Sequence, residues 1–277
     1  MNPHQYCQDK AAASGSSFYY SFMFLPPARR QAITALYAFC REVDDVVDEC
    51  TDLALAHDKL GWWRQEIERV FGATATHPVG LALQDVIGQF KISREHLDEI
   101  IDGMAMDLSI SRYADFAALE RYCYHVASVV GLLAAEIFGY QDAKTLDYAY
   151  HLGIAFQLTN IIRDVGEDAR RGRIYLPVDE LQRFNVPAAD ISNAHSSDNF
   201  RALMRFQHQR AQHYYDQALN ALPAIDRKSQ RPGLIMAAIY RALLDEIARD
   251  GFQVLDRRTS LTPLRKVWLA GLTWLKS

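Results

Sequence analysis

The chain has 277 residues, of which 49% are hydrophobic and 23% are charged, and its formal net charge is -4. This composition is ordinary for a globular protein and supplies enough apolar side chains for a large core. The acidic balance argues against a nucleic-acid surface, which needs a clustered basic excess. We therefore expect no nucleic-acid partner.

Both ends of the chain bear on where the protein acts. The N-terminal residues 1–17 lack the basic segment and apolar stretch of a signal peptide, and the four cysteines lack metal-site spacing. We therefore expect a cytoplasmic protein with reduced thiols.

No apolar run reaches the roughly 18 residues of a membrane span. The apolar stretch 266–277, with Trp268 and Trp274, predicts a core-packed final helix; the alternative is a peripheral contact with the inner face of the membrane.

Helical periodicity dominates the chain, and strand-like alternation is rare. Breaks between the periodic segments carry Pro, Ser, Asp and Gly residues, which are typical of helix starts and stops. No repeat or change of composition marks a second domain, so we expect one all-α domain over residues 1–277. The predicted helices cover residues 28–49, about 52–71, 78–90, 93–111, 115–139, 142–165, 198–220 and 231–256, and the longest irregular stretch is 166–197.

The first of these helices ends in a stripe of charged residues. Asp44 and Asp48 are four residues apart, so they share one helical face, whereas Asp45 points about 100° away. Arg41 and Tyr37 continue the same face toward the N-terminus. An Arg at this place predicts bidentate binding of a phosphate, with an ion pair to Asp44 or Asp45 as the alternative.

A second stripe lies near the end of the helix predicted over 142–165. Asn160, Asp164 and Asp168 again follow at intervals of four, and Gln157 extends their face. Like charges one turn apart destabilise an isolated helix by about 0.2–0.5 kcal/mol. One such stripe is most simply a solvated face, but two stripes in strongly apolar helices indicate a functional cavity.

Carboxylates in this arrangement are typical ligands of magnesium. Mg²⁺ prefers oxygen ligands and is commonly held by one or two carboxylates together with substrate phosphates. A metal held this way neutralises the charge of a departing diphosphate. The two Asp pairs therefore predict an enzyme that uses Mg²⁺, with Mn²⁺ as the substitute ion, on a diphosphate substrate.

Four segments of the chain resemble the squalene/phytoene synthase family, and in order they span nearly its whole length. The wording of residues 14–49 is most similar to the bacterial presqualene diphosphate synthases of the hopanoid pathway. The segments are SGSSFYYSFMFLP (14–26, similar to the substrate flap), YAFCREVDDVVDE (37–49, the first Asp signature), RYCYHVASVVG (121–131, the central helix) and QLTNIIRDVGEDARRGRIYLP (157–177, the second Asp signature).

The resemblance implies an isoprenoid-synthase helical bundle around a central cavity. In that cavity two farnesyl diphosphates would condense head to head (1′-1) to presqualene diphosphate, with release of diphosphate, for squalene and hopanoid biosynthesis. NADPH is not expected, because the reaction would stop before reduction. Downstream enzymes of the hopanoid pathway would be the protein partners.

Other functions remain open at this point. Within the family they are a complete, NADPH-dependent squalene synthase and a phytoene or dehydrosqualene synthase. A terpene cyclase would not need two similar Asp pairs. A non-catalytic helical scaffold of the same fold would be expected to have lost some of the Asp residues, all of which are present here.

The resemblance also implies roles for single residues. Tyr122 and Tyr240 would line the cavity, where a ring face stabilises a carbocation and a phenol relays a proton, although both also fit an ordinary core. Ser17 also fits a turn, and Arg171 also fits an unspecialised exposed loop. The implied metal ligands are Asp44, Asp48, Asn160, Asp164 and Asp168; the diphosphate-binding residues are Ser17, Tyr37, Arg41, Gln157, Asn160 and Arg171; and the catalytic residues are Tyr122, Tyr240 and Arg41.

Overall fold

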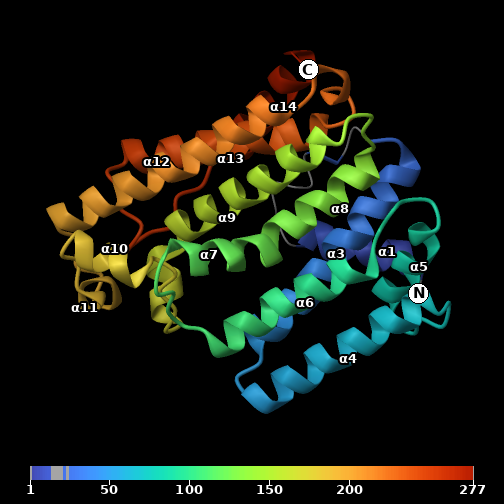
Figure 1. Ribbon diagram of the computed structural model, residues 1–277, viewed down its shortest axis with the longest axis horizontal. Coiled ribbons are helices and arrows are strands. Elements are labelled where there is room, and N and C mark those ends of the chain that lie inside the picture. The colour runs from blue at the N-terminus through green and yellow to red at the C-terminus, as the bar shows by residue number, and fades with distance from the viewer. Residues whose placement is uncertain (1, 14–20, 23–24, 277) are drawn as a thin grey trace.

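The computed structural model describes residues 2–13, 21–22 and 25–276, which form a bundle of helices lying roughly side by side (Figure 1). One isolated bridge between Arg112 and Ile174 is the only β-pairing in these residues, so the all-α prediction is confirmed. The helices are α1 (Pro3–Ala13), α3 (Pro27–Glu49), α4 (Leu53–Phe71), α5 (Pro78–Ile87), α6 (Arg94–Ser109), α7 (Phe116–Cys123), α8 (Val129–Phe138), α9 (Lys144–Arg170), α10 (Val178–Arg183), α11 (Ala188–Ser192), α12 (Asp198–Ala221), α13 (Arg231–Arg249) and α14 (Pro263–Lys276).

Several helices begin at residues that satisfy the free backbone N–H groups of the first turn. The Asp52 carboxylate accepts from the first turn of α4, and the hydroxyls of Ser93 and Ser197 do the same for α6 and α12. α3 starts instead at Pro27, whose missing N–H costs nothing at the first helical position. These local signals explain why the predicted starts lie close to the observed ones.

The core consists of two apolar clusters that meet around α8. One cluster joins α1, α3, α4, α5 and α6, and the other joins α7, α9, α12 and α13. Leu133 of α8 packs in the first cluster while Ala135 packs in the second. Residues that line the functional site therefore come from both halves of the bundle.

The segment predicted as one helix over 115–139 is interrupted in the structure. A π turn, Tyr124–Ser128, separates α7 from α8. It packs so closely on α6 that a Cβ added at Gly103 would lie 2.8 Å from Cγ1 of Val126. Single π turns of this kind are frequent at functional sites, and Val126 faces the cavity described below.

Other boundaries also differ from the sequence predictions. α1 was not predicted, and the stretch 166–197 is not irregular throughout, since it contains the end of α9 as well as α10 and α11. Because α9 continues to Arg170, both acids of the second motif lie within the helix. The helix predicted over 231–256 ends at Arg249.

The last helix, α14, departs from the expectation of a core-packed element. Ala270 is its one fully buried residue, whereas Leu264 and Leu275 are each 84% exposed. In the part of the chain that the structure describes, no helix is long and apolar enough to cross a membrane.

Candidate active site

An apolar cavity of about 200 Å³ lies between α3, α8, α9 and α13. α9 contributes a stripe of lining residues at helical spacing that runs from Tyr148 to Asn160. The predicted central cavity is thus confirmed. The other helices contribute mainly apolar side chains, among them Leu36, Val130, Ala134, Met236 and Tyr240.

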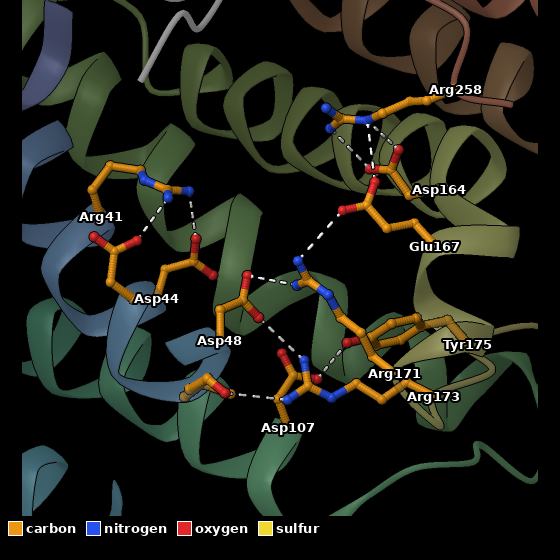
Figure 2. Close-up of polar contacts among 12 residues, drawn as sticks. Arg41, Asp44, Asp48, Asp107, Asp164, Glu167, Arg171, Arg173, Tyr175 and Arg258 are labelled. Carbon is orange, nitrogen blue, oxygen red and sulfur yellow. Dashed lines mark hydrogen bonds and ion pairs between the residues drawn. The ribbon is translucent and has the colours of Figure 1, made fainter. Parts of the chain in front are cut away.

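The first Asp motif lies at the C-terminal end of α3 (Figure 2), and Tyr37 and Cys40 of the same helix line the cavity. Arg41 donates from Nη1 to Oδ2 of Asp44 over 2.6 Å and from Nη2 to Oδ1 of Asp45 over 2.7 Å. Burial and the nearby carboxylates of Asp48 and Asp45 outweigh the attraction of Arg41 and raise the pKa of Asp44 to about 6. The ion pair considered as the alternative for Arg41 is therefore observed, and its contact with a diphosphate stays a prediction.

Asp48 is bound by two arginines that follow the second motif. Arg171 donates from Nη1 to Oδ2 of Asp48 over 2.9 Å, and Arg173 donates to Oδ1 over 3.4 Å. The other end of the Arg171 guanidinium contacts Glu167 of α9, as Figure 2 shows. Arg171 therefore joins the two motifs across the site.

The second Asp motif is held by arginines of a different origin. Arg163 donates from Nε to Oδ1 of Asp164 over 2.7 Å, and Arg258, from the loop after α13, donates to the same atom over 2.8 Å. Burial alone would raise the pKa of Asp164, but the hydrogen bonds from Arg163 and Arg258 lower it. This carboxylate is thus kept ionised.

Asp168 behaves in the opposite way, although it lies one turn further along the same helix. Burial raises the pKa of Asp168 to about 7, and the carboxylates of Asp164, Asp107 and Glu167 act in the same direction. Arg171 opposes the shift but does not cancel it. The site therefore holds more negative charge than its arginines neutralise, as expected for a place that receives cations.

A third acidic residue, Asp107 of α6, lies beside the two motifs. Tyr122 and Tyr175 each donate a hydroxyl to its carboxylate over 2.7 Å, and their rings stack with centroids 5.2 Å apart. Burial and the Asp48 carboxylate raise the pKa of Asp107, although the two hydroxyls oppose this. The arrangement is a buried carboxyl group with a proton held close to it.

The side chain of Asn160 carries an unused acceptor. Its amide nitrogen donates to Oε1 of Gln157 over 3.3 Å, but its Oδ1 is closed to solvent and accepts no hydrogen bond from any residue the structure describes. A buried oxygen without a partner is costly, so a ligand is expected there. Together with four Asp side chains this donor set consists of oxygen only, which fits Mg²⁺ or Mn²⁺.

Within residues 2–13, 21–22 and 25–276, no group of three or more His, Cys, Asp or Glu side chains is drawn together closely enough to hold a metal ion. Each of Asp44, Asp48 and Asp164 is instead paired with at least one arginine. The predicted metal ligands lie at one end of the cavity without converging on a single point.

The remaining predicted residues divide into three groups. Tyr37, Gln157 and Tyr240 line the cavity, as expected for residues that contact substrate. Tyr122 is not among the lining residues of this cavity, and its hydroxyl donates to Asp107; its expected place near the reacting carbons stays a prediction. Ser17 lies outside the described residues.

Sequence reasoning missed several residues of the site. Arg163 immediately precedes Asp164, and Arg173 follows Arg171 by two positions, so both could have been predicted as neighbours of the second motif. Arg258 lies far from both motifs in sequence, whereas Tyr175 belongs to the segment 157–177; only the packing of the chain brings Arg258 to Asp164 and Tyr175 to Asp107. Tyr240 also hydrogen-bonds Arg163, which links the cavity wall to the second motif.

Comparisons of the sequence with known proteins point to one family. A family model described as squalene/phytoene synthase matches residues 11–265. A phytoene synthase from Arthrospira platensis is 37% identical over 287 residues, which cover 99% of this chain and 93% of that protein. A 15-cis-phytoene synthase from Synechocystis is 34% identical over 286 residues, which cover 99% of this chain and 85% of that protein.

Solved structures show the same architecture. A dehydrosqualene synthase in complex with a ligand superposes with a TM-score of 0.90 at 29% identity, covering 99% of this chain and 96% of that one. Squalene synthase HpnC from Alicyclobacillus acidocaldarius gives a TM-score of 0.81 at 27% identity, and the match covers 90% of this chain and 94% of that one. The fold is therefore the isoprenoid-synthase helical bundle.

Proposed function

Because the chain belongs to the squalene/phytoene synthase family, whose members are prenyl transferases, we propose that it condenses two farnesyl diphosphates head to head. The product is presqualene diphosphate, released diphosphate is the by-product, and the pathway served is that of squalene and hopanoids. The whole chain, residues 1–277, acts as one catalytic domain. It works in the cytoplasm and requires no NADPH.

One observation carries this proposal: the Asp stripes of α3 and α9 are linked through Arg171, and Tyr37 and Asn160 of the same two stripes line one apolar cavity. A cavity of this kind suits a prenyl chain, and the acidic end suits a diphosphate that is bound through cations. Enzymes of the family generally use a divalent metal with diphosphate substrates. Asp44, Asp48, Asn160, Asp164 and Asp168 would hold Mg²⁺ or Mn²⁺, which supplies Lewis-acid stabilisation of the departing diphosphate.

The arginines of the site have two roles in this scheme. Without substrate, Arg171 and Arg258 neutralise Asp48 and Asp164. When a diphosphate occupies the site, the same guanidinium groups turn to its oxygens, which they match in bidentate geometry. Arg41 and Arg163 border the cavity residues Tyr37 and Tyr240, so they are suited to the diphosphate nearest the prenyl chain.

The chemical steps follow from these positions. The C1–O bond of the first farnesyl diphosphate breaks, diphosphate leaves with the electron pair, and the C2–C3 double bond of the second attacks the allylic cation. A proton is then lost as the cyclopropane closes. Tyr240 presents a ring face to the cation, and Asp107 with Tyr122 holds a proton at the acidic end. The apolar walls exclude water, which would quench the cation.

The lining residues of α9 run from Tyr148 to Asn160, which is about 18 Å of helix at about 1.5 Å per residue. At the far end, Tyr148 approaches α13 so closely that its hydroxyl would lie 2.4 Å from a Cβ added at Gly233.

A second candidate is phytoene synthesis from geranylgeranyl diphosphate. It is favoured by the two relatives named above, both described as phytoene synthases, of which the more similar is 37% identical. The two candidates share the site and the first bond-forming step and differ in the prenyl chain.

A product assay separates these functions. Purified protein with farnesyl diphosphate and Mg²⁺ should release diphosphate and accumulate presqualene diphosphate, with or without NADPH. Squalene as the main product with NADPH would reject the halt at the cyclopropane. A much faster conversion of geranylgeranyl diphosphate to phytoene would reject the farnesyl assignment.

A further inference from the structure

Tyr148 lies at the end of the apolar cavity that is opposite the Asp motifs. Asn160 lines the cavity at the acidic end of α9, and Tyr148 lines it about three turns earlier on the same helix. The Tyr148 side chain extends from α9 to α13, because a Cβ added at Gly233 would lie 2.4 Å from its hydroxyl oxygen and 3.4 Å from its Cζ atom. The ring therefore spans the space between these two helices.

The residues around Tyr148 make this end of the cavity a packed wall. Gln230, at the start of α13, donates from Nε2 to the carbonyl of Gly139 over 3.0 Å and to that of Ala135 over 3.4 Å, which ties α13 to the end of α8. Phe138 of α8 precedes Gly139 and lines the cavity beside Gln230. Phe138, Tyr148 and Gln230 are each no more than 4% exposed. Side chains of α8, α9 and α13 thus close the cavity at this end.

The hydroxyl of Tyr148 adds no hydrogen bond to this wall. It is closed to solvent and has no partner in the part of the chain that the structure describes. Other buried tyrosines differ: Tyr122 donates to Asp107, and the hydroxyl of Tyr215 bonds that of Thr159 over 2.9 Å. A buried hydroxyl without a partner is unfavourable, so hydrogen bonding does not explain a tyrosine at position 148. The property that remains is the length of the side chain, which reaches α13.

We propose that Tyr148 limits the length of the prenyl chain that this cavity accepts. The inference rests on the proposed function, in which the diphosphate lies among the Asp motifs and the chain extends from there along α9. The end of a farnesyl chain then meets the ring of Tyr148. A chain that is longer by one isoprene unit would have to displace this ring, which is packed against Gly233, and close-packed interiors resist such displacement.

Removing the ring should lengthen the cavity. Tyr148→Ala deletes the ring and the hydroxyl, which together contain more heavy atoms than one isoprene unit. An apolar cavity left by such a truncation collapses only in part, stays dry and binds apolar molecules. The geranylgeranyl chain, which is one isoprene unit longer than farnesyl, should then fit. Since a single methylene in a hydrophobic pocket changes selectivity by roughly tenfold or more, the preference for farnesyl should fall by at least this factor.

Binding of unreactive analogues measures the preference without catalysis. The probes are the thiolodiphosphates of farnesyl and of geranylgeranyl, in which sulfur replaces the bridging oxygen, titrated with Mg²⁺ into the full-length protein by calorimetry. The wild type should bind the farnesyl analogue more tightly by roughly tenfold or more, and Tyr148→Ala should bring the two affinities together or reverse their order. An unchanged ratio in Tyr148→Ala, or a wild type that binds both analogues equally, would overturn the proposal.

Two controls separate chain length from a general loss of packing. Tyr148→Phe keeps the ring, so it should keep the preference for farnesyl, and it should be no less stable than the wild type because the hydroxyl has no described partner. Tyr215→Ala truncates a second fully buried tyrosine of the same core cluster, but Tyr215 does not line the cavity. This variant should lose stability and keep the preference. An equal shift of preference in Tyr215→Ala and Tyr148→Ala would contradict a specific role of Tyr148.

Gly233→Ala tests the same contact from α13 and does not depend on the folding of Tyr148→Ala. The added Cβ would force the hydroxyl end of Tyr148 to move, so the farnesyl analogue should bind more weakly by roughly fivefold or more. In Gly233→Ala/Tyr148→Phe the nearest ring atom would be 3.4 Å away, which is an ordinary contact, so the affinity should return close to that of Tyr148→Phe. A double variant that binds no better than Gly233→Ala would overturn the proposed contact.

The product assay distinguishes this proposal from the assignment of function. If the wild type makes presqualene diphosphate while Tyr148→Ala keeps the farnesyl preference, the proposed function stands and the limit at Tyr148 is rejected. If the wild type makes no presqualene diphosphate but the preference among the analogues still shifts in Tyr148→Ala, the limit stands and the proposed function is rejected.

Discussion

Arg171 donates a hydrogen bond of 2.9 Å to Asp48, and these two residues are separated by 123 positions in the sequence. The first belongs to the loop after the second motif and the second to the last turn of α3. One guanidinium therefore ties together two acidic motifs that would otherwise repel each other. The acidic end of the site is thus neutralised in part by the protein's own arginines.

Asp48→Asn should abolish turnover and leave the fold intact. The substitution removes a carboxylate that is directed at the site, so we expect the rate of diphosphate release to fall by roughly 10² or more. Glu49→Gln changes the same charge at the next position, where the side chain is exposed and turned away, and should keep nearly full activity. Circular dichroism and diphosphate release measure both. Retained activity in Asp48→Asn would remove this residue from the metal site.

The stability of the metal-free protein should depend on Asp168. Burial and neighbouring carboxylates raise its pKa from 3.8 to about 7, so between these values the folded chain binds more protons than the unfolded chain. The free energy of unfolding therefore falls as pH rises through this interval and levels off above about pH 7. Asp44, whose pKa is raised to about 6, acts in the same direction.

Urea denaturation across this pH range checks the prediction. In Asp168→Asn the free energy of unfolding should depend less on pH close to neutral pH. The pH dependence at lower pH, which is due to Asp44, should remain. Mg²⁺ should stabilise the wild type more at about pH 8 than at about pH 6, because metal and proton compete for the same carboxylate. A slope that is unchanged in Asp168→Asn would show that other groups cause it.

Tyr122→Phe should impair catalysis through the loss of one hydroxyl. Asp107 would then accept from Tyr175 alone, and we expect the turnover number to fall by roughly 10- to 100-fold because proton handling is disturbed. Tyr113 stacks in the same aromatic cluster, 5.5 Å from Tyr122, but its hydroxyl has no hydrogen-bond partner among the described residues. Tyr113→Phe is therefore the control and should keep its rate. Similar losses in both variants would point to ring packing instead.

Gly166→Ala should destabilise the protein although Ala favours helices. A Cβ at this position would lie 2.1 Å from the carbonyl oxygen of Leu255, and the Gly166 N–H donates to Val254 over 3.2 Å. We expect a loss of about 1–3 kcal/mol in the free energy of unfolding, and reduced activity because the loop carrying Arg258 is displaced. Gly88→Ala, where a Cβ would meet no atom within 4 Å, should change stability by less than about 0.5 kcal/mol. Thermal denaturation of the two variants gives the comparison.

The helices and their polar stripes followed from the sequence because they depend on local spacing. A helical period of 3.6 residues is enough to place Asp44 with Asp48, and Asn160 with Asp164 and Asp168, on single faces. The family resemblance implied that Tyr240 lines the cavity; Tyr240 is among the lining residues, and its catalytic role stays a prediction. The hydrogen bond from the Tyr122 hydroxyl to Asp107 was not predicted, because no local pattern in the sequence specifies that contact.

By itself, then, the sequence determined an all-α chain with two carboxylate stripes and the chemistry those stripes are suited to. Only the tertiary structure decided which arginine neutralises which carboxylate, that Asp107 joins the acidic end, and that Tyr148 reaches α13 at the other end of the cavity. These features depend on side chains and loops that lie far apart in the chain. Their energies arise from burial and from ion pairs at short distance, and both exist only after the helices have packed.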